Sequence, residues 1–218
     1  ISNKEDIIWF YVMMLAINRH ADESVAILEE YIAKNPTSAQ AYQGLCHARL
    51  MLKGREIDTP IEYFNAPCFK CTELDPNLIY GRYYLAELHF IRGEYEKSRD
   101  YWQVMADLNP YAMFYEGLMR SSYYMGDTVA AQKYFEQVLA QYKLGYASPI
   151  IMARAYSTLD EVDSVVKYLN FAFKISDIEL VALWNEPAFD RVRDEPKFQE
   201  IANRLPNAGP VAGSALVK

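Results

Sequence analysis

The chain has 218 residues, of which 51% are hydrophobic and 23% charged, a composition that indicates a folded protein and excludes a disordered tail. Its 22 basic and 29 acidic residues give a net charge of −7. A chain of that sign repels phosphate, so direct contact with nucleic acid is not expected. Three cysteines, an odd number, are not the pattern of a disulfide-stapled secreted domain.

The first predicted helix, Ile7–Ile17, is apolar on every face. Its eleven residues fall short of the about 20 that span a bilayer, and acidic residues precede it, so neither a membrane span nor a signal peptide is expected. The chain does not begin with methionine, and we expect it to be a piece of a longer protein. Something must cover this helix: an upstream repeat or domain is the main interpretation, and a homodimer formed through Ile7–Ile17 is the alternative.

An acidic or amide residue followed by proline occurs at 35–36, 75–76 and 109–110. Proline has no amide hydrogen to donate into a helix, so each dipeptide predicts a helix end. The last two are 34 residues apart and the first two 40, which is the spacing of a repeat array with one lengthened turn. The chain therefore divides into five predicted helix pairs, at about residues 5–36, 39–76, 79–110, 112–143 and 148–176.

The third pair carries the clearest pattern. Leu85, Ala86 and His89 share a stripe of its first helix, and Ser98, Trp102 and Met105 share a stripe of its second. This resembles the tetratricopeptide repeat (TPR), a helix-turn-helix unit of 34 residues. Met105 departs from the family's pattern because it is large where a small residue is usual, which indicates a looser local contact. The positions that comply are Leu85, Ala86, Gly93, Ser98, Trp102 and Pro110.

The other pairs vary this pattern. Residues 53–58 lengthen the second turn, and Pro67 falls inside the helix predicted over 60–74, where an unrelieved proline costs about 3 kcal/mol. We expect a kink or a late start there. In the fifth pair Asp160 replaces the turn glycine. The predicted fold is an all-α, TPR-like α-solenoid of about five antiparallel helix pairs in one domain, 1–206, with a helical cap over 179–206 and a loose tail over 207–218.

The lengthened second pair and the closing segment resemble more specifically the TPR region of bacterial winged-helix (ToxR-like) transcriptional regulators and related signalling proteins. The closing motif is carried by Pro187, Phe189, Arg193, Pro196 and Phe198. The resemblance implies the sensory or partner-binding part of a larger regulator, and it leaves the effector domain open.

Catalytic motifs are missing from the sequence: it has no Gly-rich phosphate loop, no H-E-x-x-H and no G-x-S-x-G. No cofactor and no catalytic residue is expected, and His89 at a packing position is interpreted as a core histidine. Cys68 and Cys71 form a C-x-x-C, which can be a redox pair or, with Cys46 and His47, a zinc site. Both cysteines occupy packing positions of the repeat, so we interpret them as buried thiols and predict no metal.

The predicted binding site is the groove lined by the first helix of each pair, at positions i, i+4 and i+7. Tyrosines beside arginines suit a peptide, since arginine can bind a carboxylate with two hydrogen bonds. The alternative is that Glu87 and Arg120 pair with each other and that some tyrosines pack between helices. The predicted partner-binding residues are Gln43, His47, Tyr80, Tyr83, Tyr84, Glu87, Phe90, Glu116, Arg120, Tyr123 and Arg154.

Together these features predict a non-catalytic protein-interaction module that binds a peptide or protein in its groove. The alternatives are a scaffold that oligomerises through the N-terminal helix and, as a third possibility, a cysteine-based redox or metal switch. The expected compartment is the cytoplasm, or the periplasm if a transmembrane segment precedes the chain in the full protein.

Overall fold

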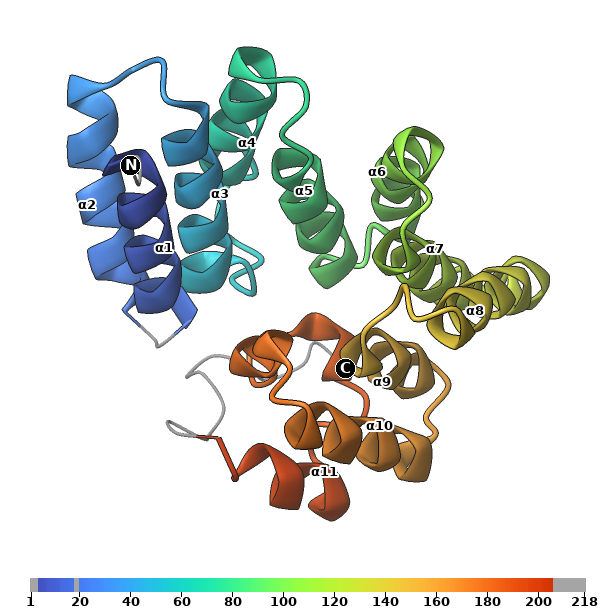
Figure 1. The fold of residues 1–218 in the computed structure, drawn as a ribbon. Coiled ribbons are helices and arrows are strands. Elements are labelled where there is room, and N and C mark those ends of the chain that lie inside the picture. The colour runs from blue at the N-terminus through green and yellow to red at the C-terminus, as the bar shows by residue number, and fades with distance from the viewer. Residues whose placement is uncertain (1–3, 18–19, 206–218) are drawn as a thin grey trace. The chain divides into compact units, whose positions relative to one another are not determined.

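The computed structural model describes residues 4–17 and 20–205, with side chains from Tyr11 onward. Over these residues the chain forms α-helices and two short 3₁₀ helices, and no strand (Figure 1). It forms two compact units, unit 1 up to Gly93 and unit 2 from Glu94. The prediction of a single domain stays a prediction. The tail predicted over 207–218 lies outside the described residues.

Unit 1 is a row of antiparallel helices (Figure 1). Its helices are α1 (Lys4–Ile17), α2 (Ala21–Lys34), α3 (Ala39–Lys53), α4 (Glu62–Leu74) and α5 (Tyr80–Ile91).

The core of its first three helices is made by Val12, Leu28 and Leu45. The Ser24 hydroxyl, also buried, donates a hydrogen bond to the Val12 carbonyl at 2.8 Å. Tyr11 is exposed, and the side chains of residues 7–10 lie outside the described part, so self-association through Ile7–Ile17 stays a prediction.

Proline inside α4 is accommodated by an arginine from α3. The helix starts at Glu62 and continues through Pro67, so the alternative of a late start at the proline is wrong. Pro67 cannot donate to the carbonyl of Tyr63, four residues earlier. Arg49 replaces that donor: its Nη1 lies 2.6 Å from the Tyr63 carbonyl oxygen, and its guanidinium lies 4.4 Å from the centre of the Tyr63 ring. Because the orphaned carbonyl is satisfied, the cost of the proline is reduced.

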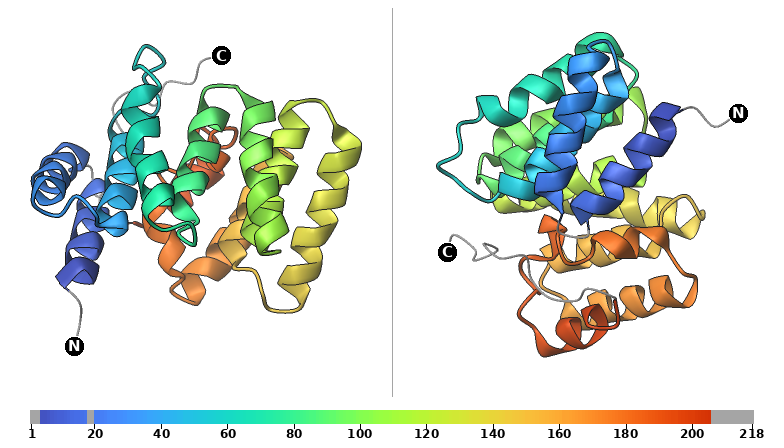
Figure 2. Two further views of the ribbon diagram at one scale, coloured as in Figure 1. Left: turned by 90° about the horizontal axis from the view of Figure 1, so that it is seen from above. Right: turned by 90° about the vertical axis from the view of Figure 1, so that its left-hand side faces the viewer.

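Unit 2 continues the pairing of antiparallel helices (Figure 2). Its elements are α6 (Tyr95–Leu108), α7 (Ala112–Tyr124), α8 (Thr128–Lys143), α9 (Pro149–Thr158), α10 (Val162–Lys174), the 3₁₀ helices η1 (Ile178–Ala182) and η2 (Pro187–Phe189), and α11 (Pro196–Ala202).

The predicted turn residues adopt the left-handed backbone that a tight turn needs. The φ angle is +73° at Gly93, +82° at Gly126 and +64° at Asp160. Glycine reaches this region without steric cost, and aspartate is among the residues that tolerate it. The prediction that Asp160 stands in for the turn glycine of the fifth pair is therefore confirmed. The third predicted pair forms α5 and α6, but the boundary between the units falls at Gly93, between these two helices.

The C-terminal segment covers the last helix pair. Phe189, Val192 and Phe198 share one buried core with Val165 and Leu169 of α10. The segment is predicted to begin with a helix over 179–186, and in the structure this region is the 3₁₀ helix η1. The cap predicted from the sequence is thus present, with shorter helices than expected.

Arginine holds the cap's loops in place. The guanidinium of Arg193 donates to the Asp190 carboxylate at 2.7 Å, to the Glu186 carbonyl at 2.8 Å, and to the carbonyl of Trp184.

Within the described residues, no helix is both long and apolar enough to cross a membrane.

Candidate functional site

The predicted groove residues divide between the two units. Unit 1 holds Gln43, His47, Tyr80, Tyr83, Tyr84, Glu87 and Phe90, and unit 2 holds Glu116, Arg120, Tyr123 and Arg154. The two sets are therefore separate candidate sites.

An aromatic cluster joins α3 to α5 in unit 1. The ring of Tyr84 stacks on His47 at a centroid distance of 5.0 Å and meets Tyr83 edge-on at 5.5 Å. Tyr80 adds a third phenol, 6.1 Å from Tyr83 and 6.2 Å from Tyr84. Tyr80 is 41% exposed, His47 and Tyr83 are half-buried, and Tyr84 is buried. The four rings form one continuous aromatic surface with a buried base.

The chemistry of this cluster is that of a neutral platform. Burial lowers the pKa of His47 to about 4, so its imidazole carries no charge at pH 7. Burial likewise raises the pKa of the Tyr84 phenol. Exposed edges and faces of such rings offer apolar contact area, while the hydroxyl groups offer hydrogen bonds. The other predicted residues of this unit, Gln43, Glu87 and Phe90, are buried.

The predicted site in unit 2 has a different character, because its charged residues are paired with one another. Glu116 lies with one carboxylate oxygen 3.3 Å from Arg120 Nε and the other 2.8 Å from Arg154 Nη2. Arg154 also reaches Glu186 of the cap at 3.5 Å. Glu116, Arg120 and Arg154 are all almost completely buried. Their guanidinium groups therefore connect α7, α9 and the cap, and are not presented to solvent as receptors for a ligand carboxylate.

The charged residues thus pair within the protein, as in the alternative to ligand binding, but Arg120 has a different partner from the one expected. Arg120 pairs with Glu116 of its own helix, whereas the sequence suggested a pair with Glu87. Sequence periodicity had not singled out Glu186, which joins the network from the cap. Its proximity to Arg154, 32 residues earlier, leaves no local signal in the sequence.

Tyr123 of α7 contacts another arginine. The Arg191 guanidinium is 5.5 Å from the Tyr123 ring centre and 6.0 Å from that of Tyr124. It also pairs with the carboxylate of Asp160 at 3.3 Å. Arg191 was not among the predicted residues, and its contacts attach the cap to α7 and to the turn before α10.

The disulfide does not join the two cysteines of the C-x-x-C motif. A disulfide joins Cys46 of α3 to Cys68 of α4, with their Cα atoms 5.2 Å apart, and Cys71 is a buried free thiol. Burial raises the pKa of Cys71 to about 11, so this thiol is protonated at neutral pH and is a poor nucleophile. In the described part of the chain, no group of three or more His, Cys, Asp or Glu side chains is placed to hold a metal ion.

The disulfide yields a quantitative prediction. It closes a loop with a sequence separation of 22, so its reduction should lower the free energy of unfolding by about 3 kcal/mol. Purified without reductant and denatured, the protein should react with one equivalent of Ellman's reagent per chain, and with three after reduction. As a control, Cys71→Ala should abolish the single reactive thiol and leave the loop closed. Three thiols before reduction would show that the disulfide does not form.

The helix pairs, their turns and the cap define the fold as a TPR-like α-solenoid. Among solved structures, a thermophilic TPR protein from Thermus thermophilus is similar to this chain. The TM-score is 0.60, the match covers 80% of this chain and 94% of the other, and the sequences are 16% identical. At that identity the likeness shows the fold alone. Neither a protein-family model nor a curated protein sequence matches the chain.

Proposed function

We propose that this chain is a non-catalytic protein-interaction module that binds a peptide segment through the aromatic cluster of unit 1. The observation that carries the proposal is the continuous ring surface formed by His47, Tyr80, Tyr83 and Tyr84, with Tyr80 at its exposed edge. Solenoids of helix pairs commonly offer such surfaces to partners. Tyrosine is enriched at protein interfaces because it combines apolar area with a polar tip and has few rotatable bonds.

The chemistry of the cluster favours a peptide with apolar or aromatic side chains. His47 is neutral, and the cluster supplies rings and hydroxyl groups instead of fixed charges. Buried Tyr84 holds the other rings in position, so a ligand would meet a surface that is already ordered. Preorganisation of this kind reduces the conformational entropy lost on binding.

Peptide capture tests the proposal directly. A phage-displayed library of random peptides is selected on the wild-type chain, and the dissociation constant of an enriched peptide is measured by fluorescence polarisation. Tyr80→Ala with Tyr83→Ala should weaken binding at least about tenfold, because a truncated hot-spot side chain costs about 2 kcal/mol or more. Phe69→Ala, which removes an exposed ring of α4 outside the cluster, is the matched control. Equal losses in both variants, or no loss in either, would refute the assignment.

We further propose that the module is the sensory or partner-binding part of a larger bacterial transcription regulator or signalling protein. The support is the closing motif: the rings of Phe189 and Phe198 lie 5.4 Å apart in the buried core of the cap, and Arg193 bonds to its loops. Sequencing the reading frame upstream of Ile1 tests this context. A winged-helix, cyclase or kinase domain there would support it, and an unrelated enzyme domain would overturn it.

A second candidate function is a scaffold that self-associates through α1. The observation that favours it is Tyr11, an aromatic side chain that is exposed directly beside the buried Val12. Sedimentation of a Tyr11→Glu variant separates this function from peptide binding, since the scaffold predicts a dimer that the variant dissociates.

A further inference from the structure

We propose that the Cys46–Cys68 disulfide controls peptide binding by the aromatic cluster of unit 1, and that a dithiol reductant converts the cluster to a form that binds more weakly. The proposal rests on the peptide site proposed above and adds its regulation. Cys46 directly precedes His47 in α3, and His47 is the residue through which α3 enters the cluster. The disulfide of this chain is therefore made next to the candidate site.

The helix α4 contacts α5 at the same place where it is bonded to α3. Gly81 of α5 lies directly against α4, since a Cβ added there would be 2.8 Å from the Cys68 carbonyl oxygen and 3.2 Å from Cys71 Sγ. Gly81 follows Tyr80 in the chain, and Tyr84 lies three residues further along. Because the two backbones touch at this point, a displacement of α4 at Cys68 is transmitted to the helix that carries three of the four rings.

Three contacts connect α3, α4 and α5 in a closed ring (Figure 1). The disulfide joins α3 to α4 with the two Cα atoms 5.2 Å apart, and the contact at Gly81 joins α4 to α5. The stack of Tyr84 on His47, at a centroid distance of 5.0 Å, joins α5 back to α3. A change in one contact of a closed ring has to be taken up by the other two. The stack yields most easily, because the backbones at Gly81 are already in close contact.

The turn between α3 and α4 leaves room for a movement of these helices. It covers residues 54–61 and is the longest connection between the described helices of unit 1. Arg49 binds the Tyr63 carbonyl at the start of α4, and Cys68 lies more than one helical turn beyond that bond. The disulfide is thus the covalent link that holds the middle of α4 against the middle of α3.

Reduction breaks this bond without removing its atoms. A dithiol supplies two electrons and two protons: the sulfur–sulfur bond breaks, Cys46 and Cys68 become thiols, and the dithiol is oxidised to a disulfide. The two sulfur atoms then have to separate to van der Waals distance. Both side chains are 1% exposed in a closely packed interior, so room is made by moving α3 away from α4. His47 moves with α3, and its stack on Tyr84 opens.

Burial also determines how the reductant reaches the bond, since a dithiol must enter through local opening of the junction between α3 and α4. Because the disulfide strengthens peptide binding, bound peptide stabilises the disulfide by the same factor, the two effects being one coupling free energy. A disulfide that serves stability alone has no such coupling within the folded state.

Fluorescence polarisation on the full chain tests the proposal, with a cysteine-free peptide selected on the oxidised protein. Reduction with dithiothreitol should raise the dissociation constant at least about tenfold, with unchanged circular dichroism. Cys71→Ala, which keeps the disulfide, should respond to dithiothreitol like the wild type. The double variant Cys46→Ala with Cys68→Ala should have one affinity in both conditions, which verifies that the dithiol acts on this bond.

Redox titration measures the same coupling from the other side. In mixtures of reduced and oxidised dithiothreitol, saturating peptide should make the disulfide harder to reduce by the factor found for the dissociation constants. A tenfold factor shifts the midpoint by about 30 mV. The variant Tyr80→Ala with Tyr83→Ala, which lacks the exposed rings, should show no shift.

The possible failures are distinguishable. Equal affinities of the oxidised and reduced chains, with binding still lost in Tyr80→Ala with Tyr83→Ala, would refute the redox control and leave the peptide site standing. Loss of helicity on reduction would overturn the proposal as well, because the disulfide would then serve folding alone. If no peptide binds the oxidised chain, the peptide site and its redox control are both refuted.

Discussion

Replacing Glu116 with glutamine should lower the free energy of unfolding by about 3–5 kcal/mol. Glu116 is fully buried, with its two oxygens 3.3 Å from Arg120 Nε and 2.8 Å from Arg154 Nη2. The amide keeps the shape of the side chain and removes its charge. Arg120 and Arg154 then lose the carboxylate that they share, while Arg154 keeps its contact with Glu186 at 3.5 Å. Removing one partner of a buried ion pair costs far more than losing a surface pair.

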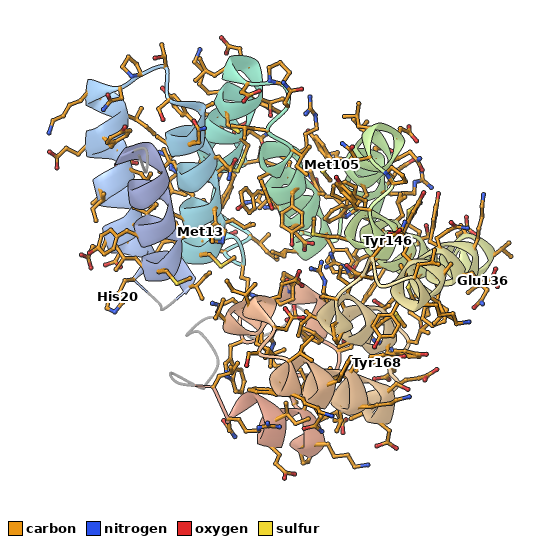
Figure 3. All side chains as sticks on the ribbon, in the orientation of Figure 1. Met13, His20, Met105, Glu136, Tyr146 and Tyr168 are labelled. Carbon is orange, nitrogen blue, oxygen red and sulfur yellow. A yellow bond between two sulfur atoms is a disulfide. The ribbon has the colours of Figure 1, made fainter. Side chains whose placement is uncertain are left out.

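Urea unfolding followed by circular dichroism measures the effect. Glu136→Gln is the matched control, because Glu136 is an exposed residue of α8 (labelled in Figure 3) and accepts a hydrogen bond from Gln132 at 3.0 Å. Its replacement should change stability by less than about 0.5 kcal/mol. Replacing Glu116, Arg120 and Arg154 together by apolar residues of similar volume should restore most of the loss. If Glu116→Gln lowered the free energy of unfolding by less than about 1 kcal/mol, the ion pairs would not be what stabilises the packing of α7 against α9.

The repeat architecture could be predicted because its signals are local. Proline after Asn109 marks the end of α6, and Gly93, Gly126 and Asp160 fall where the backbone turns left-handed. Each of these residues acts through its own φ angle or missing amide, so the sequence contains the whole cause. The late start expected at Pro67 does not occur, since α4 begins at Glu62 and runs through the proline. The donation from Arg49 to Tyr63 could not be foreseen, because it joins two helices.

The candidate site was predicted less well because a helical period identifies a face and not what covers that face. The i, i+4, i+7 stripe of α7 and α9 includes Glu116, Arg120 and Arg154, whose charges ordinarily indicate exposure. Burial is possible here because opposite charges from two helices meet, and their separation along the chain hides the pairing. His47 and the tyrosines of α5 do come together, since neighbouring repeats bring the same positions side by side.

The cysteine pairing, too, could not be predicted from spacing along the chain. The C-x-x-C spacing drew attention to Cys68 and Cys71, which lie three apart on one helix. Side chains at that spacing have Cβ atoms about 5–6 Å apart, more than the roughly 4 Å that a disulfide requires. The disulfide instead joins Cys68 to Cys46 on the neighbouring helix. An odd cysteine count therefore did not argue against a disulfide, since Cys71 is the remainder.

A second large effect is expected where α6 packs on α7, at Trp102 and Gly117. Trp102 is completely buried, and its indole ring lies directly against the Gly117 backbone. A Cβ added at Gly117 would lie 2.7 Å from Trp102 Nε1 and closer still to Cδ2 and Cε2. We expect Trp102→Ala to cost about 3–5 kcal/mol through the cavity it leaves. Gly117→Ala should cost about 1–3 kcal/mol by forcing the ring to move.

The double variant separates packing from helix propensity. Alanine is favoured over glycine inside a helix by up to about 1 kcal/mol, so propensity alone predicts that Gly117→Ala stabilises the protein in every background. Close packing predicts that the sign reverses: the substitution destabilises the wild type and is neutral or stabilising once Trp102→Ala has removed the ring. Gly44→Ala in α3 is the control, because its added Cβ would meet flexible methyl groups of Leu28 at 3.2 Å. A stabilising Gly117→Ala effect in both backgrounds would mean that the ring relaxes freely, and a destabilising effect in both would mean that the clash is not with Trp102. Either result would show that contact with this ring is not what requires glycine at 117.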